Sequence, residues 1–410
     1  MTTTRKTRIV TAFLTGAALL STGVPAAHAA VTGGPTISAP TARNGSAGGW
    51  AGITREPVAI DMGHGWVARG ELDSPSGAKG RLPVVVLLHG SGHNDMDQSM
   101  PDGKGSTFVP LSQAIAPQGY AVLRFNKRGV TGVGPVLSKD PAQLAPPKPY
   151  EQIVRDAAAV VRFAATSSKV DPAKIFLLGH SEGTQVAANL AAAPTTYGIP
   201  KPAGVIEMGV VGLETKQLVT LQIFGKLLAQ LHAEFDVNGD GDLTATEATD
   251  GLIGQPKAVA DAFRAVLFAG GKVLPATDTN HDGRLQIDAE VGPALRAATG
   301  IDAYPNLPGL DQATKNYLVD IARFATVTKD LPRFTGPTLM LNGESDIQTP
   351  ARAALVADAA VAASGNHDHK IIIYPGMAHT MNITPKFTPD FGSPDPTVLK
   401  DVQSWLKAHR

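Results

Sequence analysis

The sequence contains no cysteine, few aromatic residues and no excess of charge of either sign. Without cysteine the chain has neither a disulfide nor a thiol for catalysis, so its stability must come from the core and from any bound metal. The 36 basic and 36 acidic residues balance, and the balance becomes −3 (33 − 36) without the three basic residues of the leader described below. This near-neutral charge gives no indication of nucleic acid or an anionic membrane as a partner.

A run of apolar residues long enough to span a membrane is also missing. The apolar run Ile9–Leu20 is interrupted by polar residues and is shorter than the roughly 20 residues that a bilayer span needs. It follows basic residues and precedes Ala27-His28-Ala29, a small-x-small cleavage site. The pattern predicts a signal peptide over residues 1–29 and a secreted protein, followed by a disordered linker over residues 30–50, which are rich in small residues and proline.

Buried apolar runs alternate with helical patterns along most of the remaining chain. Strands are expected at Glu56–Met62, His64–Leu72, Pro83–Leu88, Tyr120–Phe125, Ile175–Leu178, Ala203–Val210, Pro337–Leu341 and His369–Tyr374. Helices are expected at Phe108–Ala116, Tyr150–Thr166, Pro350–Ala363 and Pro396–His409, with a proline-rich loop over residues 135–149. This alternation predicts an α/β fold with a mostly parallel, doubly wound sheet.

The alternation stops between residues 213 and 333, where the pattern is helical throughout and no strand is expected. The length of 410 residues also favours more than one domain. We therefore expect a core built from residues 51–212 and 334–410, with a helical cap inserted between two consecutive strands of the sheet.

A nucleophile elbow is predicted at Gly179-His180-Ser181-Glu182-Gly183, because an apolar strand precedes it and a helix-prone segment follows. Such a turn raises the Ser181 hydroxyl above the sheet. Glycine suits the first and last positions, where a Cβ would press on the turn or on the neighbouring strand. The alternative is a plain strand-to-helix turn with a capping serine.

A serine nucleophile needs a base and a group that orients it, and both must come from loops at the carboxyl ends of the parallel strands. His379 follows the strand that ends at Tyr374, and Asp346 follows the strand Pro337–Leu341. The weaker candidates are Glu344 and Glu214 for the acid and His93, His180, His367 and His369 for the base. The expected catalytic residues are therefore Ser181, His379 and Asp346.

The oxyanion of the tetrahedral intermediate needs preorganised N–H donors. One is expected from the backbone of Glu182, at the start of the helix that follows the nucleophile. The other is expected from the loop His89–Gly92, with Ser91 preferred and Gly90 as the alternative.

These segments together resemble the α/β-hydrolase fold superfamily, in its esterase and acyl-peptidase-like branch. The similar segments are LLHGSG (Leu87–Gly92), the region Asp95–Asp97, FNKRGV (Phe125–Val130), GHSEG, GESD and GMAH. The resemblance implies the same nucleophile, base and acid, and a structural role in ion pairing for Lys127 and Arg128. It implies carboxylic ester hydrolysis for most members, with some thioesterases and peptidases.

Two acidic loops lie in the predicted cap. The first fits the twelve-residue EF-hand loop, with oxygen ligands expected from Asp236, Asn238, Asp240, the Asp242 carbonyl, Thr244 and Glu247, and Gly241 at the turn. The segment Lys216–Phe235 is the expected incoming helix.

A second copy begins at Asp278 and continues through Asn280, Asp282, Arg284, Asp288 and Glu290. It departs from the pattern at position 12, which is Ala289. The ligand at the end of this loop is therefore Asp288, a displaced Glu290 or absent. The second loop either binds calcium or serves mainly to pair with the first loop.

The sequence thus predicts a secreted serine hydrolase that acts on small ester or acyl substrates, with Ca²⁺ as a structural ion in the cap and no cofactor for the chemistry. A peptidase or acyl-peptidase of the same fold is one alternative. The other is a calcium-binding interaction module on an inactive hydrolase scaffold.

Overall fold

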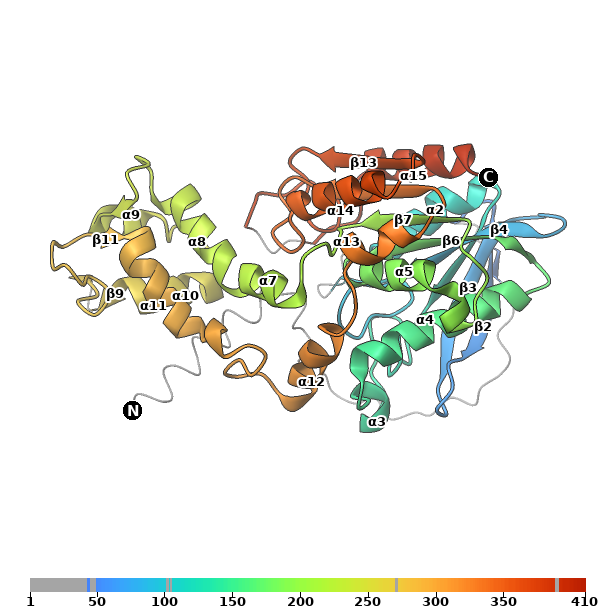
Figure 1. Ribbon diagram of the computed structural model, residues 1–410, viewed down its shortest axis with the longest axis horizontal. Helices are drawn as coiled ribbons and strands as arrows, with labels where there is room; N and C mark the ends of the chain where they lie inside the picture. Colours follow the sequence, from blue (N-terminus) through green and yellow to red (C-terminus); the bar gives the residue numbers. More distant parts are fainter. Residues whose placement is uncertain (1–42, 45–48, 101–102, 104, 270–271, 388–390) are drawn as a thin grey trace. The chain divides into compact units, whose positions relative to one another are not determined.

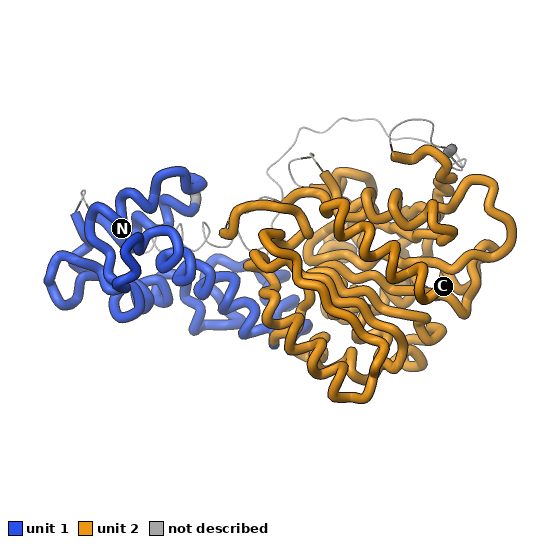
Figure 2. Tube along the Cα trace, turned by 90° about the horizontal axis from the view of Figure 1, so that it is seen from above, with its two compact units in different colours: residues 1–21, 214–322 blue, residues 22–213, 323–410 orange. Residues whose placement is uncertain are grey.

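The computed structural model describes residues 43–44, 49–100, 103, 105–269, 272–387 and 391–410. The predicted signal peptide lies outside these residues, as does most of the predicted linker. The described chain divides into two compact units, one comprising Glu214–Ala322 and the other comprising the segment up to Leu213 together with Arg323–Arg410 (Figure 2). No helix among the described residues has the length and hydropathy of a membrane-crossing segment.

The larger unit is built on a nine-stranded sheet with the order β1-β2-β3-β5-β4-β6-β7-β12-β13 (Figure 1). Its strands are β1 (Arg43–Asn44), β2 (Ile53–Asp61), β3 (Val67–Pro75), β4 (Leu82–Leu88), β5 (Ala121–Phe125), β6 (Val170–His180), β7 (Gly204–Met208), β12 (Thr338–Gly343) and β13 (His369–Tyr374). The pairs from β5 to β13 are parallel, whereas β1, β2 and β3 form an antiparallel edge that joins β5. The predicted mostly parallel sheet is confirmed.

Helices cover both faces of this sheet. They are α2 (Phe108–Ile115), α3 (Pro141–Leu144), α4 (Pro149–Thr166), α5 (Glu182–Ala192), α6 (Pro194–Tyr197), α13 (Val327–Asp330), α14 (Ala351–Ala363) and α15 (Pro396–Ala408). One hydrophobic cluster joins α2 and α15 to alternate residues of the central strands, among them Ile206, Met208, Leu339 and Leu341. The other residues of these strands face α4, α5 and α14, so the sheet is wound on both sides.

Two expectations for this unit need correction. The short helix α3 lies in the proline-rich segment expected to be a loop, with Asp140 as its N-cap and proline at its first position. In the segment expected to be disordered, Arg43–Asn44 pairs with β2, and the Trp50 ring lies 4.3 Å from the Arg55 guanidinium.

The smaller unit is mainly helical. Its elements are α7 (Thr215–Thr220), a π-turn (Leu221–Gly225), α8 (Lys226–Gln230), a π-turn (Leu231–Phe235), β8 (Asp242–Leu243), α9 (Ala245–Asp250), α10 (Lys257–Leu267), β9 (Phe268–Ala269), β10 (Lys272–Val273), β11 (Leu285–Gln286), a π-turn (Ile287–Val291), α11 (Gly292–Thr299) and α12 (Gln312–Ile321). It has a hydrophobic core of its own, which includes Phe235, Phe263 and Leu285.

The prediction that this segment contains no strand is wrong. Strand β8 pairs with β11 and β9 pairs with β10, each over two residues. Residues 323–333, predicted to belong to the insertion, lie in the larger unit, where α13 packs on α5 and α14.

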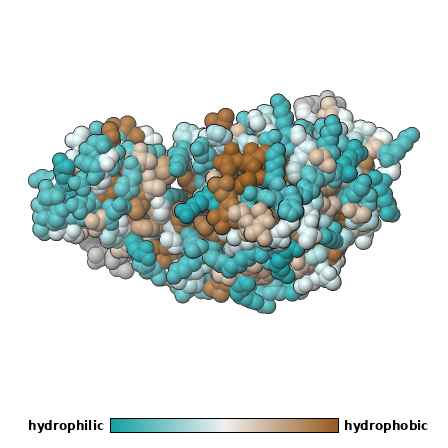
Figure 3. Space-filling view, turned by 45° about the horizontal axis from the view of Figure 1, so that its top comes forward, coloured by the Kyte–Doolittle hydropathy of each residue, from teal (hydrophilic) through white to brown (hydrophobic). Residues whose placement is uncertain are grey.

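On the face shown in Figure 3, patches of apolar side chains interrupt a mainly hydrophilic surface.

Candidate active site

Ser181 occupies a tight turn between β6 and α5. Its backbone is left-handed, with φ 56° and ψ −121°, a conformation that a non-glycine residue adopts only under strain. A Cβ on Gly179 would overlap the carbonyl of Gly183, and a Cβ on Gly183 would overlap the carbonyl of Leu88 on β4. The two glycines therefore allow the strand, turn and helix to approach closely enough to form the elbow.

His379 and Asp346 come together at the carboxyl ends of β13 and β12. Nδ1 of His379 lies 2.9 Å from Oδ2 of Asp346, and both side chains are buried. Burial raises the pKa of Asp346, but the neighbouring imidazole and the Thr349 N–H and O–H groups outweigh it, so the pKa is lowered. Asp346 is therefore a carboxylate that can accept the Nδ1 proton of His379.

Ser181 and His379 flank the same short segment after β7. The Ser181 N–H donates to the Met208 carbonyl at 2.9 Å, and a Cβ on the next residue, Gly209, would lie 3.3 Å from Cε1 of His379. Among the hydrogen bonds of the described residues none joins the Ser181 hydroxyl to His379.

Glu344, Glu214 and His369 are competing candidates that do not contact the His379 side chain in the described residues. Glu344 is exposed and accepts from the Gly376 N–H, and Glu214 opens the smaller unit. His369 begins β13 and pairs with Asp358 at 2.7 Å, at the opposite end of that strand from His379. Of the candidates for the acid, Asp346 is the one hydrogen-bonded to His379.

The loop after β4 distinguishes the two candidate oxyanion donors. The Gly90 N–H already donates to Oε1 of Gln98 at 2.8 Å. Among the hydrogen bonds of the described residues none uses the Ser91 N–H, and a Cβ on Gly90 would lie 3.2 Å from Cβ of Ser181. This geometry leaves the Ser91 N–H available for a ligand beside Ser181, and α5 begins at Glu182, the residue after Ser181.

His180 connects the loop after β4 to the loop that carries His379. Nε2 of Gln98 lies 2.7 Å from Nδ1 of His180, and Nε2 of His180 lies 3.2 Å from the His379 carbonyl. Because the Gln98 amide oxygen accepts from Gly90, its NH₂ group must donate, and His180 must carry its proton on Nε2. Burial, aided by His379, lowers the pKa of His180 to about 3, so this imidazole is neutral.

Lys127 and Arg128 each form a buried ion pair. Nζ of Lys127 lies 2.7 Å from Oε1 of Glu182, and Arg128 makes a two-pronged contact with Asp156, the shorter distance being 2.7 Å. The resemblance predicted ion pairing at these two positions. It gave no indication that the partner of Lys127 is the residue next to the nucleophile.

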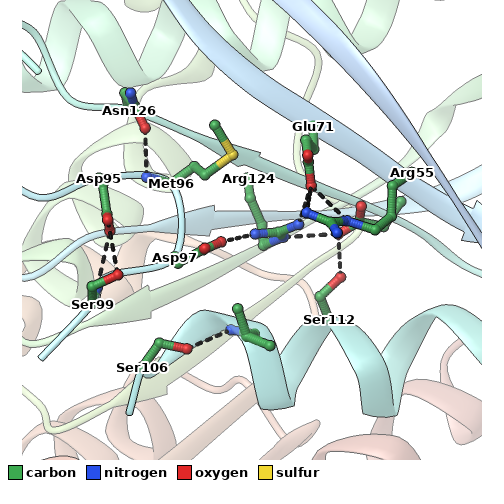
Figure 4. Close-up of polar contacts among 12 residues, drawn as sticks. Arg55, Glu71, Asp95, Met96, Asp97, Ser99, Ser106, Ser112, Arg124 and Asn126 are labelled. Atoms are coloured by element: carbon green, nitrogen blue, oxygen red, sulfur yellow. Dashed lines mark hydrogen bonds and ion pairs between the residues drawn. The ribbon is translucent and has the colours of Figure 1, made fainter. Parts of the chain in front are cut away.

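Arg124 contacts the loop after β4 through Asp97 (Figure 4). Its guanidinium is fully buried and pairs with Glu71 at 2.6 Å, with Asp73 at 2.8 Å and with Asp97 of the loop. A buried guanidinium requires such partners, since an unpaired one would cost several kcal/mol, as an order of magnitude. The Met96 N–H donates to Asn126 at 2.7 Å, which gives the loop a second attachment (Figure 4).

The two acidic loops of the smaller unit fold alike. In the first, Asp236 accepts from the N–H groups of Gly239, Asp240 and Gly241, and Glu247 accepts from the N–H and hydroxyl of Thr244. Strand β8 of this loop pairs with β11 of the second, so that Leu243 faces Leu285. Within the described residues no group of three or more His, Asp or Glu side chains is gathered as metal ligands would be.

In the second loop, Glu290 folds over the loop and Asp288 does not. Glu290 is buried and accepts from the N–H groups of Thr279, Asn280 and Gln286. The Asp288 side chain is 75% exposed and contacts His232. The π-turn Ile287–Val291 brings Glu290 to the N–H of Gln286, just as Glu247 meets the N–H of Thr244.

A family model described as "Alpha/beta hydrolase family" matches residues 85–388 of the chain, which include the nucleophile turn and the loops of Asp346 and His379. The chain belongs to the alpha/beta hydrolase family. The esterase EstD of Thermotoga maritima is 31% identical over 130 residues, which are 32% of this chain and 28% of that esterase. The match thus spans less than a third of either protein.

The chain is also similar to solved structures whose sequences are more distant. Est1E from Butyrivibrio proteoclasticus is 14% identical, with a TM-score of 0.42 over 86% of this chain and 98% of that one. Acetyl xylan esterase from Paenibacillus sp. R4 is 16% identical, with a TM-score of 0.47 over 90% of this chain and 88% of that one.

Proposed function

We propose that this alpha/beta hydrolase cleaves carboxylic esters through an acyl-enzyme on Ser181. The observation that carries the proposal is the buried hydrogen bond between His379 and Asp346 beside a strained serine turn. The sequence similarity to an esterase supports esters as the substrates.

In the proposed reaction, Nε2 of His379 takes the proton of the Ser181 hydroxyl as Oγ bonds to the ester carbonyl carbon. The N–H groups of Ser91 and Glu182 donate to the oxyanion that forms. When this intermediate collapses, the bond to the alcohol oxygen breaks and His379 returns the proton to that oxygen. A water molecule then repeats both steps on the acyl-enzyme and releases the acid.

A fluorophosphonate probe tests the reaction class. The wild-type protein should be labelled, and Ser181→Ala should abolish labelling without lowering the melting temperature by more than a few degrees. Ser76→Ala, at an exposed position, is the matched control and should label like the wild type. Labelled wild-type protein should then hydrolyse neither nitrophenyl esters nor aminoacyl anilides, and unlabelled protein should prefer the esters. A folded wild-type protein that resists the probe would refute the proposal.

We also propose that residues 1–29 direct export and that the smaller unit binds calcium. The leader pattern supports export, and an N-terminus at Ala30 in protein collected from the medium would test it.

For calcium, the support is the pair of similar loops joined through β8 and β11, each closed by a buried or half-buried glutamate. Calcium prefers carboxylate and carbonyl oxygens, which both loops supply, and the buried Oδ1 of Asp278 lacks a hydrogen-bond partner among the described residues. Glu290 is the better candidate than Asp288 for the last ligand of the second loop.

The insertion leaves the core after β7, at the edge that carries Ser181, so we propose a calcium-stabilised cap that shapes substrate access.

A further inference from the structure

The buried ion pair between Lys127 and Glu182 lies at the two backbone groups assigned to the oxyanion. Glu182 is itself one of the two donor residues, through its backbone N–H. Lys127 reaches the other donor indirectly, since its Nζ lies 2.8 Å from the carbonyl oxygen of Gly90. That carbonyl belongs to the same peptide group as the Ser91 N–H.

A trans peptide is planar, and its C=O and N–H bonds point in opposite directions. The Gly90 carbonyl is held by Nζ of Lys127 and by Nδ2 of Asn94, each at 2.8 Å. Holding the carbonyl end of this peptide therefore also fixes the direction of the Ser91 N–H at its other end.

The charge on Lys127 has a second effect. A cation on a carbonyl oxygen polarises the whole amide, which makes the N–H of the same peptide a stronger donor. The Lys127 side chain is only 9% exposed and that of Glu182 is fully buried, so water screens this effect weakly. Glu182 in turn holds Nζ in place through a distance of 2.7 Å.

We propose that Lys127 is a positioning residue for catalysis, which orients and polarises the Gly90–Ser91 peptide so that the Ser91 N–H stabilises the oxyanion. The proposal rests on the proposed ester hydrolysis at Ser181. It assigns to the lysine of FNKRGV a part in the transition state, in addition to its ion pair.

The alternative is that Lys127 merely neutralises a buried carboxylate. Removing one partner of a buried pair is strongly destabilising because it leaves the other charge uncompensated. The variants Lys127→Met, Glu182→Gln and the double variant separate these two roles. In the double variant no buried carboxylate remains at position 182, but the Gly90 carbonyl still lacks its cation.

The measurements are kcat and KM for nitrophenyl acetate, and the inhibition constant of an alkyl trifluoromethyl ketone, which forms a tetrahedral adduct with serine. Loss of one oxyanion donor costs roughly 10²–10³ in kcat, so weakening one should cost about 10–100-fold. We expect Lys127→Met to lower kcat by that factor, to change KM by less than about three-fold and to weaken the inhibitor by a similar factor as kcat/KM. The same loss should remain when Lys127→Met is made in the Glu182→Gln background, because the amide oxygen of glutamine can still accept from Nζ of the lysine.

Arg128→Met is the matched control, because the Arg128–Asp156 pair is as deeply buried but has no contact with the Gly90–Ser91 peptide. It should lower the melting temperature without a comparable loss of kcat. If the loss caused by Lys127→Met disappears in the Glu182→Gln background, or if Arg128→Met lowers kcat equally, the positioning role is wrong. A wild-type protein that the fluorophosphonate probe does not label would instead refute ester hydrolysis itself.

Discussion

Glu207 provides a direct test of the energetics of the core. It lies on β7 between β6 and β12, where it pairs in register with Gly179 and Met340. Its neighbours Ile206 and Met208 pack toward α2 and α15, so the Glu207 side chain points to the opposite face, on which α5 packs. The side chain is fully buried, and both carboxylate oxygens lack a hydrogen-bond partner among the described residues.

Burial raises the pKa of Glu207 well above its ordinary value. In the unfolded chain the same group titrates near pH ~4.3. Below that pH the carboxyl is protonated in both states and adds no pH dependence. Above it, the unfolded state gains stability by losing the proton that the folded state keeps. The free energy of unfolding therefore falls by up to about 1.4 kcal/mol for each pH unit, until the pH reaches the folded-state pKa.

The perturbation is Glu207→Gln, which keeps the size of the side chain and removes the titration. Between pH 5 and pH 7 the wild type should lose up to about 2.7 kcal/mol of unfolding free energy relative to this variant. The assay is urea unfolding followed by tryptophan fluorescence. All three tryptophans of the sequence, Trp50, Trp66 and Trp405, lie in the larger unit, so the signal reports the unit that contains Glu207.

Glu344→Gln, at an exposed position of the same unit, is the control for the replacement of a glutamate by glutamine. A difference between Glu207→Gln and the wild type that stays constant from pH 5 to pH 7 would refute the reasoning. In that case the carboxyl must have the same protonation in the folded and unfolded chains.

Two further predictions concern the catalytic residues and the smaller unit. Asp346→Asn should lower kcat on nitrophenyl esters by about 10⁴-fold, because the amide cannot hold His379 in the tautomer with a proton on Nδ1, and an unchanged kcat would exclude Asp346 as the orienting group. Glu290→Gln should reduce the stoichiometry of calcium binding measured by isothermal titration, whereas Asp288→Asn should not, and equal effects of the two would show that the π-turn does not select the ligand.

Much of the larger unit was predictable because its central strands, such as β4, β7 and β12, are buried on both faces and read as unbroken apolar runs. The strand His369–Tyr374 has its expected bounds, and Pro83–Leu88 differs from β4 by one residue. The short helix α3 and the pairing of Arg43–Asn44 were not predictable in this way. Both depend on a local cap or on a partner strand, and neither leaves a periodic pattern.

The smaller unit shows a different limit. Helical periodicity predicted a helix over Lys216–Phe235, and the folded chain is helical from Thr215 to Phe235. Periodicity could not indicate β8 and β11, which are two residues long and exist through their pairing. The π-turn at Ile287–Val291 accommodates one additional residue before Glu290. A comparison of the two loops by position alone places Ala289 opposite Glu247, whereas the folded chain places Glu290 there.

The elbow itself illustrates how local sequence and tertiary structure combine. In Gly179-His180-Ser181-Glu182-Gly183, the glycines could be explained from the chain alone, because the turn leaves no room for a Cβ. The two residues beside the serine carried no such signal. In the folded protein His180 donates to the carbonyl of His379, and Glu182 holds the Lys127 ammonium that contacts the Gly90 carbonyl. The residue before Ser181 thus contacts the loop of His379, and the residue after Ser181 is linked through Lys127 to the loop of Gly90. Substitution of His180 should therefore disturb the position of His379, and substitution of Lys127 should disturb the Gly90–Ser91 peptide.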